Sequence, residues 1–300
     1  MKIKTYVKHP SSILVNISNI IPIKFIGDRT YLKIKYRLIF GKKLNLQKPD
    51  TFNEKIQWLK LNDRKDIYTK MVDKFEAKKI VANIIGDEYI IPTLGVWNTF
   101  EQIDFNKLPN QFVLKPTHTS GNVFICKDKS TIEFNTLKKM VKKWMKRQYY
   151  YYQREWPYKN IKPRIIAEQF MEADDKKELN DYKIFCFNGV AKIILVCSNR
   201  KGLFKNTDFF DTEWNLLPFT RERHTNNING IDRPMNLNKM VDIANKLSKN
   251  IPFVRVDLYE INRKVYFGEL TFYPSTGFEG FEPEEWDKNL GEMLELPKKN

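Results

Sequence analysis

The chain has 300 residues, of which 42% are hydrophobic and 14% aromatic, and this composition favours a folded globule over disorder. Its formal net charge is +16, from 52 Lys and Arg against 36 Asp and Glu. Such a charge favours anionic partners such as nucleic acid, phosphorylated ligands, acidic sugar polymers or an anionic membrane face. A lysine-rich composition that serves only solubility is the open alternative.

The sequence contains no apolar run that approaches the ~18 residues of a transmembrane helix. The apolar stretch at 13–26 is interrupted by polar residues and lacks a small-residue cleavage site, which argues against a signal peptide. We therefore expect a cytoplasmic location. Cys126, Cys186 and Cys197 lie in apolar contexts without metal-ligand spacing, so we expect them to be core thiols.

The first elements in chain order are helical. Residues 31–40 have helix-like apolar spacing with lysines between, which indicates either a helix packed on the core or a basic element touching a membrane; packing is the commoner outcome. Thr51 and Glu54 form a capping-box pattern that predicts a helix start. A further helix is expected from about residue 66 to 85, ending near Gly86.

Strand-like segments then dominate. Pro92 weakens a strand at 88–96, and a strand at 111–116 has a hairpin partner at 122–126. Residues 131–154 indicate one long basic helix ending in a run of tyrosines, followed by a strand at 164–170. A hairpin at 181–198 turns at Asn188-Gly189, and a helix is expected at 236–249. The pattern is α+β with mostly antiparallel strands, without GxGxxG or a Walker P-loop.

The last hairpin carries the strongest chemical signal. Apolar runs at 254–259 and 264–271 flank a short polar turn. Alternation places Arg255 and Asp257 on one face of the first strand, and the hairpin can bring Glu269 beside them. A cation and two carboxylates on one sheet face suit magnesium with a phosphate-bearing ligand.

Three upstream positions carry weaker signals. Lys115 ends an apolar strand before the hydroxyl-rich loop 117–122, and a lysine with such a loop suits phosphate, although a solvated lysine is the ordinary alternative. Glu168 ends another strand, where a structural role is equally expected. Asp181 and Lys183 form a charge pair on one strand face.

Taken in order, these motifs resemble the ATP-grasp superfamily, in which D-alanine–D-alanine ligase shows the same succession. The resemblance is closer to the TupA-like ATP-grasp family, which is associated with teichuronopeptide and capsular polysaccharide synthesis. It extends from about residue 30 to 285. The segments that carry it are 51–59, 87–92, 112–116, 180–183 and 268–272.

The resemblance implies an α+β ATP-grasp fold, in which two α+β subdomains clasp the nucleotide after a basic helical N-terminal region. The implied division is a basic helical region at 1–65, a linker part at 66–110, a small lid subdomain at 111–171 and a catalytic subdomain at 172–300.

The same resemblance implies ATP and Mg²⁺ as cofactors and a role for each matching residue. Lys74, Lys115 and the loop residues Thr119, Ser120 and Gly121 would bind the phosphates, while Glu168, Gln169 and Met171 would hold adenine. The ribose carboxylate is open between Glu172, Asp174 and Asp175, of which Asp175 is the chosen candidate. Asp257, Glu269 and Thr271 would bind metal, with Arg255, Lys183 and His118 as catalytic groups.

Two of these assignments are weaker than the others. Thr271 stands where many relatives carry asparagine, and a hydroxyl is a poorer magnesium ligand, so a second metal site is open. His118 suits acid–base work, but a polar loop residue is the equally ordinary interpretation.

The implied function is an ATP-dependent carboxylate–amine ligase that forms an acyl phosphate on a uronic or related acid of a surface polysaccharide precursor. The amine would be an amino acid or amino alcohol, and peripheral contact with an anionic membrane is an open possibility. A glycosyltransferase using a sugar nucleotide is the alternative, although the sequence lacks a clear Asp-x-Asp motif. The lysines are spread rather than clustered with aromatics, so no specific nucleic acid is expected.

Overall fold

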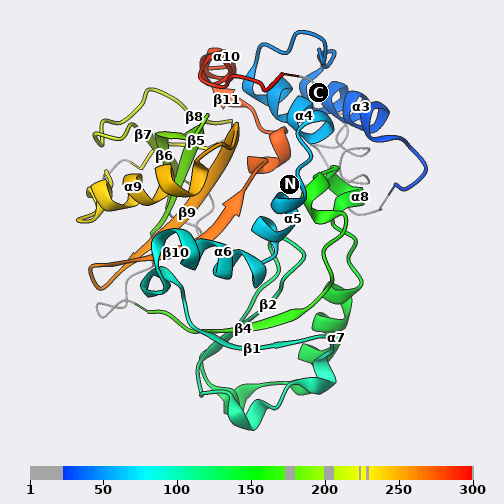
Figure 1. Cartoon of the computed structure of the whole chain (residues 1–300), viewed down its shortest axis with the longest axis vertical. Helices are drawn as coiled ribbons and strands as arrows, with labels where there is room; N and C mark the ends of the chain where they lie inside the picture. The colour runs from blue at the N-terminus through cyan, green and yellow to red at the C-terminus, as the bar shows by residue number, and fades with distance from the viewer. Residues whose placement is uncertain (1–22, 173–179, 199–205, 223, 228–229, 299–300) are drawn as a thin grey trace, which may run out of the picture.

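A computed structural model describes residues 23–172, 180–198, 206–222, 224–227 and 230–298 of the chain. In this part, the strands form two larger antiparallel sheets (Figure 1). Each of them has a hydrophobic core of its own. The combination of helices with antiparallel sheets confirms the α+β class expected from the sequence. Within the described residues, no helix has the length and apolar character needed to cross a bilayer.

The N-terminal helices pack on the larger core. They are α3 (Asp28–Phe40) and α4 (Phe52–Asn62). In α3, Tyr31, Leu32 and Tyr36 are buried, which is the packing that its apolar spacing indicated. The predicted capping box begins α4, because the backbone N–H of Glu54 donates to Thr51 Oγ1 at 3.3 Å and the Glu54 carboxylate accepts from the backbone of Thr51 at 3.4 Å.

The single helix predicted at 66–85 is wrong. The structure has two helices there, α5 (Asp66–Val72) and α6 (Glu76–Ile85). Asp73 separates them, because its Oδ1 accepts from the backbone N–H groups of Phe75 and Glu76 at 2.8 and 3.1 Å and so caps the second helix. As a result, Lys74 lies in a turn rather than within a helix.

The smaller sheet has the strand order β1-β4-β2-β3. Its strands are β1 (Thr93–Trp97), β2 (Phe112–Pro116), β3 (Phe124–Cys126) and β4 (Ile165–Gln169). The predicted hairpin of β2 and β3 is confirmed. The strand expected from residue 88 begins only at Thr93, since Asp87–Tyr89 form a 3₁₀ turn.

The long helix predicted at 131–154 is also wrong. The segment forms α7 (Phe134–Met145) and the short α8 (Tyr150–Gln153). The two pieces make different contacts: Leu137 and Val141 bury in the core of the small sheet, whereas Tyr150 donates its hydroxyl hydrogen to Asp28 Oδ2 on α3 at 2.5 Å. The chain turns between these two contacts.

The larger sheet has the strand order β10-β9-β5-β6-β7. Its strands are β5 (Asp181–Phe187), β6 (Val190–Ser198), β7 (Asn206–Phe210), β9 (Phe253–Ile261) and β10 (Lys264–Thr271). Both hairpins predicted in this region are confirmed. The first turns at Asn188 and Gly189, whose φ angles of 50° and 83° are those of the left-handed region.

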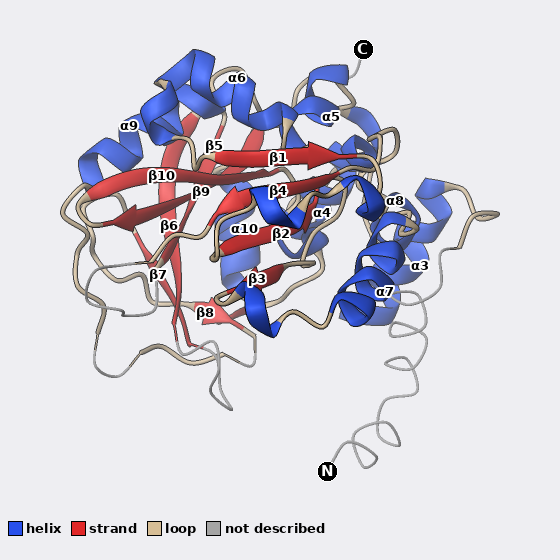
Figure 2. Cartoon of the chain, turned by 90° about the horizontal axis from the view of Figure 1, so that it is seen from below, coloured by secondary structure: helices blue, strands red, loops and turns tan. Residues whose placement is uncertain are grey.

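Helices cover one face of the larger sheet. Figure 2 shows α6 and α9 (Leu237–Ser248) side by side along it, and the Ile90–Phe267 bridge links the segment before β1 to β10. The edge of the fold is completed by β8 (Thr220–Arg221), β11 (Phe281–Glu282) and α10 (Glu285–Glu292). Cys126 and Cys186 are buried and Cys197 is half-buried, each as a free thiol.

Candidate active site

The hairpin of β9 and β10 is bulged at Gly268. Phe267 lies opposite Leu258, but the next residue to pair, Glu269, lies opposite Asp257, and Thr271 lies opposite Arg255. Without the extra residue, Glu269 would face Val256, so the bulge places the polar groups of both strands on one face. A Cβ at Gly268 would lie 2.9 Å from the carbonyl oxygen of Asp257, which explains the glycine.

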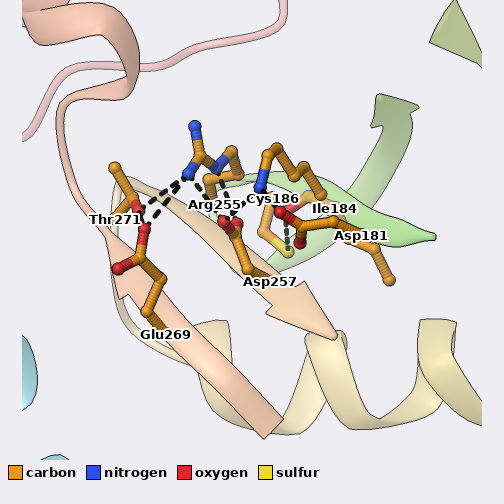
Figure 3. A network of polar contacts seen from close by, with 8 residues as sticks. Asp181, Ile184, Cys186, Arg255, Asp257, Glu269 and Thr271 are labelled. Atoms are coloured by element: carbon orange, nitrogen blue, oxygen red, sulfur yellow. Dashed lines mark hydrogen bonds and ion pairs between the residues drawn. The ribbon is translucent and has the colours of Figure 1, made fainter. Parts of the chain in front are cut away.

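Arg255 is at the centre of this face (Figure 3). Its Nε lies 2.6 Å from Asp257 Oδ1 and its Nη2 lies 2.7 Å from Asp257 Oδ2, a bidentate pair. The same Nη2 lies 3.1 Å from Thr271 Oγ1 and 3.4 Å from Glu269 Oε1. The hydroxyl of Thr271 in turn donates to Glu269 Oε1 at 3.1 Å.

The neighbouring strand adds a second cation. Lys183 on β5 pairs in register with Asp257, and its Nζ lies 2.9 Å from Asp257 Oδ2 while also contacting Asp181. Asp257 is only 2% exposed, and burial alone would raise its pKa, but Arg255 and Lys183 outweigh burial and hold the pKa low. Asp257 is therefore a buried carboxylate kept ionised by two cations.

A second charged cluster lies on the smaller sheet. Glu168 is 6% exposed, and its two oxygens lie 2.6 Å from Lys115 Nζ and 2.5 Å from Lys78 Nζ. Burial would raise the pKa of Glu168, but the two lysines outweigh it and hold the pKa below its usual range. The expected role of Glu168 at adenine stays a prediction, because this structure shows its carboxylate between two ammonium groups.

Lys74 lies between the two clusters. Its Nζ donates to the carbonyl oxygen of Thr119 at 2.6 Å, and its backbone N–H donates to the carbonyl of Thr117 at 3.2 Å. Burial lowers the pKa of Lys74, while the charges of Glu269 on β10 and Glu168 on β4 raise it. The predicted phosphate loop is thus anchored by a lysine that interacts electrostatically with carboxylates of both sheets.

The rest of the loop is compact. Thr119 is fully buried, its Oγ1 accepts from the Asn122 amide at 2.9 Å, and Gly121 has a φ of 78° that favours glycine. Burial raises the pKa of the Tyr149 phenol, and a hydrogen bond with the Ser120 side chain opposes this rise. His118 is 4% exposed and lies by the end of α7, near Trp144 and Arg147, and burial lowers its pKa. Its catalytic role stays a prediction.

The expected adenine and ribose groups lie at the end of β4. The backbone N–H of Gln169 donates to the carbonyl of Pro92 at 3.0 Å, and Met171 is half-buried. Glu172 is partly exposed and lies 3.9 Å from Lys127. Asp174 and Asp175 lie outside the described residues.

The structure therefore brings most of the predicted residues into two clusters joined by Lys74. Sequence reasoning missed Lys78, which lies on α6 and reaches Glu168 on β4 only through the packing of these two elements.

The donor chemistry on the bulged hairpin fits magnesium. Asp257 and Glu269 lie opposite each other and offer hard oxygen ligands, and Mg²⁺ is commonly held by one or two carboxylates together with substrate phosphates. Within the described residues, no cluster of three or more His, Cys, Asp or Glu side chains forms a complete metal site, so phosphate oxygens would have to complete it. Thr271 contacts Glu269 and Arg255 and in this structure orients both.

Comparison with solved structures returns ATP-grasp ligases. D-alanine–D-alanine ligase from Bacillus anthracis, complexed with ATP, is 16% identical over 67% of this chain and 55% of that chain, with a TM-score of 0.41. Phosphoribosylamine–glycine ligase from Thermotoga maritima is 13% identical over 70% and 50%, with a TM-score of 0.43. The ligase PsnB, complexed with a minimal precursor, Mg and ADP, is 9% identical over 81% and 62%, with a TM-score of 0.40.

The chain thus spans little more than half the length of the first of these structures, at 55%. Comparison with curated proteins gives no match. The family model described as TupA-like ATPgrasp matches residues 54–295, which include both charged clusters and the loop between them. The chain therefore belongs to the TupA-like ATP-grasp family, as the order of its motifs indicated.

Proposed function

We propose that this protein is an ATP-dependent ligase that joins a carboxylate to an amine through an acyl phosphate. One observation carries the proposal: Lys74 binds the loop carbonyl of Thr119 while its charge interacts with both Glu269 and Glu168. The cations proposed to bind phosphate and the carboxylates proposed to bind magnesium therefore lie close enough to act together.

In the proposed reaction, Lys74, Lys115 and the loop 117–122 hold the nucleotide phosphates. Asp257 and Glu269 would hold Mg²⁺, which when bound neutralises charge on the phosphates. Arg255, fixed in place by Asp257, supplies positive charge where the phosphoryl group moves to the substrate carboxylate. No covalent bond to the protein is needed, so positioning and charge are its main contributions.

We propose a uronic acid or related acid of a surface polysaccharide precursor as the acid, and an amino acid or amino alcohol as the amine. The support is the family resemblance, together with a net charge of +16 that attracts an acidic substrate. Because the reaction consumes ATP, the proposed site of action is the cytoplasm.

The test is formation of ADP that depends on the acid. D-glucuronate, D-galacturonate and their UDP derivatives serve as acids, with amino acids and ethanolamine as amines, and mass spectrometry detects the amide. Glu269→Gln should abolish turnover while the fold remains intact by circular dichroism. Unchanged amide formation by Glu269→Gln would show that the metal assignment is wrong.

The alternative activities give different results in a thermal-shift panel. A ligase should be stabilised by ATP with Mg²⁺, because a ligand that binds the folded state raises the melting temperature. Stabilisation by UDP-sugars but not by ATP would favour a glycosyltransferase. Salt-sensitive binding of generic DNA without any effect of ATP would favour a polyanion-binding protein.

A further inference from the structure

Glu155 is a buried carboxylate to which the reaction described above assigns no role. It lies just before the 3₁₀ turn Trp156–Tyr158 and is 4% exposed. In the described part of the chain, no Lys, Arg or His nitrogen lies within 4.0 Å of its carboxylate, and no donor bonds to it. A buried carboxylate that no cation contacts directly is costly, and a bound cation would offset this cost.

The backbone before Glu155 is held in a rare conformation. Arg154 has a φ of 57°, in the left-handed region that non-glycine residues seldom adopt. Its guanidinium is 1% exposed and binds the carbonyl oxygens of Ile23 and Ile26 at 2.5 and 2.9 Å, and it pairs with Asp28 at 3.2 Å. These contacts hold the strained turn, and strain of this kind is concentrated at functional sites.

A lysine joins the same segment to the catalytic hairpin. Lys60 is fully buried, and its Nζ donates to the carbonyl of Gln153 at 3.0 Å and to the carbonyl of Thr276 at 2.7 Å. Thr276 lies just after β10, the strand that carries Glu269. Glu155 is thereby tethered near the end of the hairpin that holds the proposed metal ligands.

The electrostatic neighbours of Glu155 agree with this position. Burial raises its pKa to about 7, and the charges that act on it are those of Lys60 on α4, Glu269 on β10, Lys35 on α3 and Arg255 on β9. The charge of Glu155 therefore interacts with groups of the β9–β10 hairpin and of the N-terminal helices.

Two half-buried tyrosines complete the surroundings. The ring centroids of Tyr149 and Tyr158 are 4.8 Å apart, and both phenols are influenced by the charges of Glu155 and Glu269. Tyr149 also lies near Ser120 of the phosphate loop. Aromatic faces beside a carboxylate are the chemistry that recognises an ammonium ion.

We propose that Glu155, Tyr149 and Tyr158 bind the amine substrate as its ammonium ion, next to the site where the acyl phosphate forms. The proposal rests on the ligase function proposed above and adds to it where the second substrate binds. The tyrosine faces and the Glu155 carboxylate would select a cation, while the phosphate side of the site, with Lys74 and Lys115, would repel it.

The chemical step balances. Glu155 accepts one proton from the ammonium, and the freed nitrogen lone pair forms the C–N bond to the acyl carbon. The C–O bond to phosphate breaks with its electron pair on oxygen, and phosphate takes a second proton from the nitrogen. The products are the amide, hydrogen phosphate and protonated Glu155, which then returns its proton to solvent.

Hydroxylamine separates this step from the one before it. It is largely uncharged near neutral pH and traps an acyl phosphate as a hydroxamate, so it does not require an ammonium site. With D-glucuronate or UDP-glucuronate as acid, Glu155→Gln should form hydroxamate within about threefold of wild type. Amide formation from L-lysine, L-glutamate or ethanolamine should fall about 100-fold, as expected when a charge partner is lost.

A second pair of variants tests the site without depending on how Glu155→Gln folds. Tyr158→Leu should raise the KM for the amine about tenfold without affecting hydroxamate formation, as loss of a cation–π contact predicts. Tyr151→Leu is the matched control, because the Tyr151 ring faces Lys24 and Arg154 instead, and it should leave both products unchanged. The shift in melting temperature with ATP and Mg²⁺ verifies that each variant is folded.

The possible outcomes are distinct. An equal fall of amide and hydroxamate in folded Glu155→Gln and Tyr158→Leu, or no fall of amide in either, would overturn the amine site alone. If wild type forms no acid-dependent hydroxamate with any acid, the ligase proposal fails and the amine site fails with it.

Discussion

Arg255 and Asp257 form a bidentate pair from two positions on the same strand, with Nε–Oδ1 and Nη2–Oδ2 distances of 2.6 and 2.7 Å. Side chains two residues apart on a strand share a face, so the pair is built into β9 itself. The pair holds the guanidinium against Glu269 and Thr271 on the neighbouring strand. The guanidinium that we propose to be catalytic is therefore oriented by the side chains of its own hairpin.

Arg255→Lys should lose this orientation, because an ammonium cannot form the planar two-point contact. We expect kcat to fall about 100-fold to 1000-fold, as for the loss of a preorganised charge, with a smaller effect on the KM for ATP. Arg263→Lys, in the exposed turn of the same hairpin, is the control and should have wild-type activity. Equal activity of the two variants in a coupled ADP assay would contradict the role of Arg255.

Glu168→Gln should destabilise the fold. The change leaves Lys78 and Lys115 facing each other without the carboxylate that now separates them at 2.5 and 2.6 Å. Breaking a buried ion pair costs about 3–5 kcal/mol, and because Lys115 is partly exposed we expect about 2–4 kcal/mol in urea unfolding. Glu172→Gln, whose ion pair is 3.9 Å long and exposed, should change the free energy of unfolding by less than about 0.5 kcal/mol. Similar losses of unfolding free energy in both variants would show that the buried ion pairs contribute no more to stability than the exposed one.

Gly268→Ala should disturb the bulge that aligns the two strands. The added Cβ would lie 2.9 Å from the carbonyl oxygen of Asp257 and 3.0 Å from the Tyr259 ring, so the backbone must shift. We expect a loss of about 1–3 kcal/mol of stability and a weaker response of activity to magnesium. Gly27→Ala is the control, since its Cβ would enter open space. A wild-type magnesium titration for Gly268→Ala would argue that the bulge does not set the metal ligands.

Lys60 should make stability depend on pH. Burial lowers its pKa from 10.5 to about 7, so between these values the unfolded chain binds a proton that the folded chain does not. Stability therefore rises with pH across this window, by at most about 1.4 kcal/mol per pH unit. The advantage of wild type over Lys60→Met in urea unfolding should grow by about 1–2 kcal/mol from pH 7.5 to 9.5. Parallel stability curves for the two proteins would contradict the lowered pKa.

Local patterns predicted several elements correctly. The Thr51–Glu54 capping box, the turn at Asn188-Gly189 and the last hairpin depend on neighbouring residues, and the structure confirms each. The helix breaks at Asp73 and after Met145 were missed, because they depend on a side-chain cap and on tertiary contacts that differ between the two halves of one segment.

The sequence alone determined the family, the α+β class and the shared face of Arg255 and Asp257, since motif order and strand alternation are written along the chain. Only the tertiary structure decided that Lys78 pairs with Glu168 and that Gly268 shifts Glu269 opposite Asp257. These last contacts join residues far apart in the chain or depend on a one-residue change of register. Packing between elements determines these relationships, and the local sequence does not indicate them.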